Sequence, residues 1–188
     1  SATNAPPREI HFVITGISIK EEDEYTGKYG IVAFGIQNFP VIWSGMGNVA
    51  GTSTPVNACA IGLDTALREM SAWGFLRERL QDTNLKVVKF ILDSSSLARM
   101  IGPARGKLPP DISLKTYVHA LCRRIDDMKR QSAGRYKLYC QPISKGKMWD
   151  MGRAVCNAAT EAAKRRDCHA WVSYSDAAFD IMRNMGIA

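Results

Sequence analysis

Hydrophobic positions in the first quarter of the chain follow the pattern of short β-strands. Residues 10–15, 29–37 and 39–45 are rich in β-branched and aromatic side chains, and only short polar stretches separate them. Connections this short predict three antiparallel strands in a meander. The charged stretch 21–28 is typical of a hairpin loop, and the glycine-containing stretch 45–55 predicts a loop before the first helix.

Helical and strand patterns alternate in the rest of the chain. Apolar residues recur at helical spacing from Thr54, a candidate N-cap followed by Pro55, to about Leu80. Further on, the pattern predicts a buried strand over 85–92, a short helix to residue 100, a helix over 113–131, a strand over 136–143 and a helix over 149–166. This order indicates an α/β fold whose mixed five-stranded sheet has three antiparallel meander strands and two crossover strands, flanked by helices.

The length of 188 residues suits one domain with its own core. We expect residues 8–167 to form this domain. The small, proline-rich stretch 1–7 predicts a flexible arm. The extension 168–188 carries aromatic residues that predict packing against the domain or an interface.

The net charge of +7 and a pI near 9.3 favour contact with a polyanion, most commonly nucleic acid. On charge alone, a basic domain with no such role is an equally good interpretation. The five cysteines are odd in number and widely spaced without a CxxC pair, which predicts reduced thiols and an intracellular protein of the cytoplasm or nucleus. No apolar run approaches the ~20 residues of a membrane span, so no membrane partner is expected.

Four short segments, spread along the chain, carry a further pattern. They are Ile14 to Ser18, Thr54 to Leu67, Leu92 to Ser94, and Asn157 to Glu161. In order, they resemble the Thr-Asp-Gly-Ser, first-helix, Asp-Ser and last-helix motifs of the ribonuclease H family. The resemblance spans most of the chain and implies a ribonuclease H-like fold.

The resemblance also implies where catalytic residues would lie. The family uses four carboxylates to hold two divalent ions about 3.5–4 Å apart. The first position falls on Gly16 and the second on Cys59, so both carboxylates are replaced. The third is kept as Asp93 and the fourth as Glu161. These remnants predict a catalytically depleted member, a pseudo-nuclease that needs no cofactor.

Other interpretations of the two remnants stay open. Asp93 can simply cap the helix that follows it, and Glu161 can pair with Lys164 or Arg165 at helical spacing. Asp93 and Glu161 are also the candidates for a weak cation site. The alternative function is an active ribonuclease that cleaves RNA in RNA–DNA hybrids with Mg or Mn at a rearranged site, for example one that includes Asp64.

Basic residues gather around an aromatic one near the last predicted helix. The candidate nucleic-acid-binding residues are Lys145, Lys147, Trp149, Arg153, Lys164 and Arg165. An RNA–DNA hybrid or RNA would be recognised there through charge, shape and 2′-hydroxyls; a solvated basic face with Trp149 in the core is the competing interpretation. We therefore expect a module that binds nucleic acid or a protein partner, including neighbouring domains of a larger chain. An unrelated α/β scaffold remains a third hypothesis.

Overall fold

The computed structural model describes residues 8–35, 41–52, 54–70, 85–102, 112–132, 134–144, 146–163 and 171–173. Within these ranges one mixed sheet has the strand order β5-β4-β1-β2-β3-β6. Its strands are β1 (Glu9–Glu21), β2 (Glu24–Gly35), β3 (Val41–Thr52), β4 (Val87–Leu92), β5 (Lys137–Pro142) and β6 (Trp171–Ser173). The first three pair antiparallel, and β4 and β5 run parallel to β1. The predicted fold class is confirmed, and the short β6 adds a further strand beside β3.

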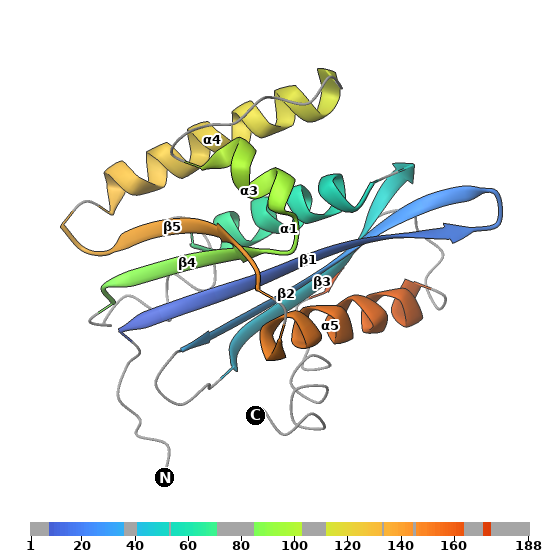
Figure 1. Cartoon of the computed structure of the whole chain (residues 1–188), viewed down its shortest axis with the longest axis horizontal. Helices are drawn as coiled ribbons and strands as arrows, with labels where there is room; N and C mark the ends of the chain where they lie inside the picture. The colour runs from blue at the N-terminus through green and yellow to red at the C-terminus, as the bar shows by residue number, and fades with distance from the viewer. Residues whose placement is uncertain are drawn as a thin grey trace, which may run out of the picture.

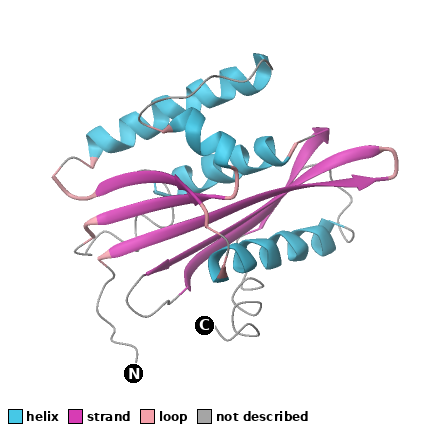
Figure 2. Cartoon of the chain, viewed as in Figure 1, coloured by secondary structure: helices cyan, strands magenta, loops and turns pink. Residues whose placement is uncertain are grey.

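Helices cover both faces of this sheet (Figures 1 and 2). Three helices, α1 (Pro55–Met70), α3 (Ser95–Ile101) and α4 (Ile112–Gln131), lie on one face. The helix α5 (Lys147–Ala163) packs alone among the described helices on the other face, over β1, β2 and β3. The predicted continuation of the first helix to Leu80 lies outside the described residues. None of the helices in the described ranges is long and apolar enough to cross a membrane.

The β1–β2 hairpin extends well into the stretch that was predicted to be a loop. Glu21 pairs with Glu24, so the turn is confined to Glu22 and Asp23, with a left-handed φ of 56° at Glu22. Lys28 lies inside β2 and is fully buried, and its Nζ donates a hydrogen bond to Asn48 Oδ1 on β3. The prediction was wrong because the charged composition of this stretch concealed a lysine with a buried polar partner.

The strand β3 runs through glycines that were assigned to a loop. Gly45 pairs with Ile31, and Gly47 pairs with Tyr29. A Cβ atom at Gly47 would lie within 2.5 Å of the Tyr29 ring, so the ring occupies the space that a side chain would fill. Pairing with β2 therefore outweighs the poor intrinsic strand preference of glycine.

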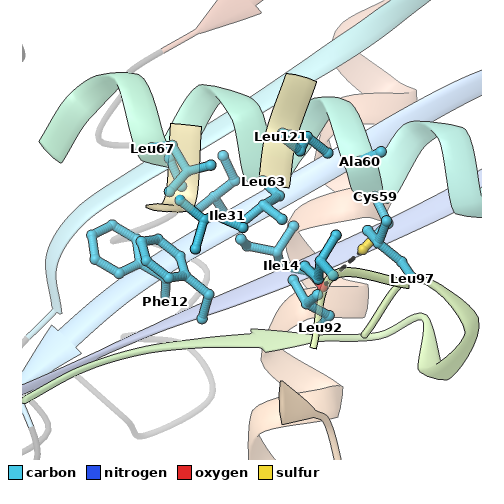
Figure 3. Packing of buried hydrophobic residues seen from close by; sticks show 14 of the residues in the cluster. Phe12, Ile14, Ile31, Cys59, Ala60, Leu63, Leu67, Leu92, Leu97 and Leu121 are labelled. Carbon is cyan, nitrogen blue, oxygen red and sulfur yellow. Dashed lines mark hydrogen bonds between the residues drawn. The ribbon is translucent and has the colours of Figure 1, made fainter. Parts of the chain in front are cut away.

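The hydrophobic core lies between the sheet and the three-helix face (Figure 3). Phe12 of β1 stacks on Phe90 of β4 with ring centroids 4.9 Å apart. The helix α1 begins as predicted, because Thr54 Oγ1 accepts a hydrogen bond from Asn57 N at 3.1 Å and Pro55 is the first helical residue. This core fixes α1 against the middle of β1, beside the end of β4 where the candidate site lies.

Candidate functional site

Asp93 stands at the carboxyl end of β4, next to β1. Ile14 pairs with Leu92, and Asp93 N donates a hydrogen bond to Ile14 O at 2.9 Å. The side chains of Ile14 and Leu92 point into the core beneath α1. Since successive strand residues alternate between faces, Thr15 and Asp93 both point toward α5.

Both carboxylate oxygens of Asp93 contact α5. Trp149 Nε1 donates to Oδ1 at 3.0 Å, and Arg153 Nη2 lies 2.8 Å from Oδ2. The Arg153 guanidinium also lies 4.9 Å from the centroid of the Trp149 ring, within the range of a cation–π contact. Only 8% of the Asp93 side chain is exposed. The positive charge at this carboxylate therefore comes from the chain itself.

Asp93 is not the cap of the helix that follows it. The N-cap of α3 is Ser94, whose Oγ accepts a hydrogen bond from Leu97 N at 3.1 Å. The capping interpretation of Asp93 was wrong. The serine takes the capping role, which leaves the aspartate carboxylate for the two α5 side chains.

The helix α5 packs directly on β1 beside Asp93. A Cβ atom at Gly152 would lie 1.9 Å from Thr15 Oγ1, so no side chain fits between helix and strand. Cys156 Sγ lies 3.4 Å from Thr15 O as a hydrogen-bond donor. The Thr15 hydroxyl is buried and has no hydrogen-bond partner in the part of the chain that the structure describes. The helix α5 therefore lies directly against β1 at the residue beside Asp93.

Gly16, assigned to the lost first carboxylate, faces the other way. A Cβ atom there would lie 2.4 Å from Cys59 N and 2.5 Å from Pro55 O, both backbone atoms of α1. A side chain at residue 16 would therefore run into α1. The two positions assigned to the lost carboxylates, Gly16 and Cys59, are therefore neighbours in space, and the β1 residue that faces α5 beside Asp93 is the neutral Thr15.

Cys59, assigned to the lost second carboxylate, lies on α1 and is fully buried. Its S–H donates to Ile14 O at 3.7 Å, as Figure 3 shows. Burial raises the pKa of the Cys59 thiol to about 12, and the nearby Asp93 charge contributes to the rise. Burial likewise raises the pKa of Cys156 to about 12. Both thiols beside Asp93 are therefore neutral at physiological pH.

The remaining candidate carboxylates lie elsewhere. Glu161 is exposed on α5 and follows Arg153 by eight residues, which is about 12 Å along a helix axis. Asp64 is buried and forms ion pairs with Arg68 at 2.6 Å and with Arg124 of α4. Asp93, Glu161 and Asp64 are not brought together. Across the described ranges, no group of three or more His, Cys, Asp or Glu side chains is placed to hold a metal ion.

These residues do not fit a two-magnesium centre. Magnesium needs several oxygen ligands in near-octahedral geometry, and a thiol is a soft ligand that suits it poorly. One carboxylate, Asp93, is present at the junction of β1, β4 and α5, and Arg153 and Trp149 engage both of its oxygens. A guanidinium stands at the carboxylate where a cation would bind.

Of the six candidate nucleic-acid-binding residues, two have described side chains. Trp149 is half-buried and donates a hydrogen bond to Asp93, and 37% of the Arg153 side chain is exposed. Lys147 is the first residue of α5. Lys145, Lys164 and Arg165 lie outside the described residues. Sequence reasoning did not pair Arg153 with Asp93, although the i, i+4 spacing of Trp149 and Arg153 placed them on one helix face.

Comparisons with known proteins give the fold. No family model and no curated protein matches the chain by sequence. Among solved structures, LC11-RNase H1, isolated from compost by a metagenomic approach, is 17% identical with a TM-score of 0.58; 84% of this chain and 99% of that chain are covered. LC11-RNase H1 in complex with an RNA/DNA hybrid is 14% identical with a TM-score of 0.56, covering 82% and 99%.

A third structure extends the likeness to an archaeon. RNase H1 from the halophile Halobacterium salinarum is 14% identical with a TM-score of 0.52, and the match covers 82% of this chain and 98% of that one. The chain therefore has a ribonuclease H-like fold, as the motifs predicted. At these identities the likeness establishes the fold alone.

Proposed function

We propose that this domain is a ribonuclease H-like module that has lost hydrolytic activity and binds nucleic acid. The observation that carries the first half is the engagement of Asp93 by Arg153 and Trp149. Two-metal hydrolysis needs ions that generate the attacking hydroxide and stabilise the leaving oxygen. With Arg153 at the carboxylate and Thr15 neutral beside it, the described part of the domain offers no group that positions either ion.

Charge and fold support the second half of the proposal. The chain carries a net charge of +7, and a protein that neutralises phosphates gains affinity through the release of counterions. A structural neighbour of the same fold has been solved with an RNA/DNA hybrid. An RNA–DNA hybrid or RNA is accordingly the expected ligand of the six candidate basic and aromatic residues in and near α5. Such binding requires no metal and no intact carboxylate site.

An active ribonuclease with a rearranged site is the alternative, and the retained Asp93 is the observation in its favour. A rearranged metal site requires that other carboxylates lie close to Asp93. Asp64 is held between two arginines near α4, and Glu161 lies about 12 Å along α5 from Arg153. These positions favour the binding module over the nuclease.

The test combines cleavage with binding on the same substrate. An end-labelled RNA–DNA hybrid is incubated in magnesium or manganese with the wild type, with Asp93→Asn and with an active ribonuclease H1 as assay control. We expect no cutting by either form of this chain, together with salt-dependent binding of the uncut hybrid by the wild type. Metal-dependent cutting that Asp93→Asn abolishes would establish the nuclease instead. Absence of both cutting and binding would turn the search toward a protein partner.

A further inference from the structure

A second candidate contact surface lies at the corner where α4 meets β5, away from Asp93. An open hollow of about 330 Å³ occurs there, lined by Lys129, Gly134, Tyr136, Lys137, Leu138 and Tyr139. Lys129 belongs to the last turn of α4, and Gly134 has a left-handed φ of 79° in the connecting turn. The remaining lining residues lead into and form β5, which pairs only with β4 within the described residues. The hollow therefore follows an edge strand of the sheet.

Tyr139 lines this hollow and is exposed to solvent. Leu138 is buried in the core, so its neighbours Lys137 and Tyr139 point to the opposite side of β5. The Tyr139 side chain is 44% exposed. In the described part of the chain the other large exposed hydrophobic side chain is Tyr25, at the β1–β2 hairpin. Because the exposed Tyr139 ring does not pack in the core, its face is available for stacking.

The charge around Tyr139 is positive. Lys129, Arg135 and Lys137 are all exposed and have no ion-pair partner within the described residues. The adjacent Arg130 pairs with Asp127 and is neutralised. Two of these cations, Lys129 and Lys137, line the same hollow as the exposed tyrosine. Proteins that bind single-stranded nucleic acid combine these two features, since cations follow the phosphates while unpaired bases stack on aromatic rings.

We propose that this corner, the α4–β5 hollow, binds single-stranded nucleic acid, with a base stacked on Tyr139 and phosphates held by Lys129 and Lys137. The inference rests on the proposed nucleic-acid binding and extends it to a second surface. Tyr139 is opposite Lys89 on β4, and Asp93 follows Lys89 by four residues, or about 13 Å of strand. The α4–β5 hollow is therefore distinct from the Asp93 site but lies on the same sheet.

The experiment measures the anisotropy of a labelled single-stranded oligonucleotide of about 12 pyrimidines, a length within the range of known single-strand sites. We expect Tyr139→Ala to weaken binding about tenfold, as the loss of one stacked base does, and Tyr139→Phe to bind like the wild type. The matched control is Tyr25→Ala, which removes a tyrosine of similar exposure from the hairpin. A Lys129→Ala/Lys137→Ala variant should reduce the slope of log affinity against log salt by about 1.4, and Lys20→Ala/Lys115→Ala, two exposed lysines elsewhere, should not.

Each outcome bears on the proposal. Equal binding by Tyr139→Ala and the wild type, or an equal loss in Tyr25→Ala, overturns it. Parallel losses for single strands and for the RNA–DNA hybrid also overturn it, because a duplex has no unpaired base to stack. If the wild type binds the hybrid but no single strand, only the proposal for the α4–β5 hollow is overturned. A wild type that binds neither overturns the proposed function as well.

Discussion

Removing the Arg153 guanidinium, which lies beside Asp93, should lower the stability of the domain. Arg153→Met keeps much of the side-chain volume but deletes the charge that lies 2.8 Å from Asp93 Oδ2. The carboxylate, 8% exposed, is then left with the Trp149 N–H as its hydrogen-bond donor from α5. Asp93→Asn makes the complementary change, because it removes the negative charge and keeps an oxygen that can accept from Trp149.

The size of the effect follows from burial. Breaking a buried ion pair by deleting one partner costs about 3–5 kcal/mol. Because 37% of the Arg153 side chain is exposed, water screens part of the interaction, and we expect about 1–3 kcal/mol for Arg153→Met. The double variant Arg153→Met/Asp93→Asn no longer buries a lone carboxylate. It should therefore be less destabilised than the sum of the single variants, by about 1–2 kcal/mol.

Urea unfolding of the four proteins, followed by circular dichroism, measures this coupling energy. The matched control is the cycle of Arg130→Met and Asp127→Asn, whose ion pair on α4 has side chains 74% and 53% exposed. That cycle should give no more than about 0.5 kcal/mol. The proposed role of the ion pair is refuted if the changes in the free energy of unfolding caused by the two single variants sum to that of the double variant within about 0.5 kcal/mol. In that case Arg153 does not compensate the Asp93 charge.

Three further predictions concern two residues of β1 near Asp93 and the buried cysteines. Gly16→Ala should destabilise the domain by about 3 kcal/mol, or about 6–12 °C in melting temperature, since its Cβ meets α1 backbone atoms at 2.4 and 2.5 Å; a melting temperature like that of the wild type contradicts this packing. Thr15→Val, one residue away, removes a buried hydroxyl without a partner in the described residues and should be neutral or stabilising in the same melt. The pKa values of Cys59, Cys140 and Cys156 are raised by burial to about 12 from 9.0. The folded state therefore retains thiol protons that the unfolded state releases, and stability should fall between about pH 9 and 12. Urea midpoints across this window measure it, and Cys59→Ala should flatten the decline.

The order of elements could be predicted from the sequence because each element carries its own local signal. Thr54 and Pro55 mark the start of α1, and the continuous apolar run of β4 marks a buried strand that ends at Asp93. The extent of the β1–β2 hairpin could not be predicted in this way. Lys28 belongs to a strand because Asn48, twenty residues later, accepts its hydrogen bond in the interior. That partner is set by the register of β2 and β3, which no local pattern encodes.

The candidate site was predicted in part, for reasons of register and topology. The end of β4 was placed correctly, but the sequence did not predict which face of the sheet each residue of β1 occupies, because successive strand residues alternate between faces. Ile14 faces α1, yet Val13 is apolar too, so the alternation of apolar residues did not decide which face Gly16 occupies. Arg153 follows Asp93 by sixty residues, and only the crossover through β5 brings α5 to it. The motif resemblance pointed instead to Glu161, about 12 Å further along the helix.

The ion pair at Asp93 also bears on where a polyanion can bind. Thr15 and Cys59 carry no charge beside Asp93. The nearly buried Asp93 carboxylate therefore needs a compensating positive charge from another residue. Arg153 supplies that charge within the chain, so no bound cation is required to balance the carboxylate. The same ion pair reduces the share of Arg153 that is available to phosphates. Affinity for nucleic acid must then come from cations without an ion-pair partner inside the chain, and in the described residues such cations include Lys129 and Lys137, which line the α4–β5 hollow.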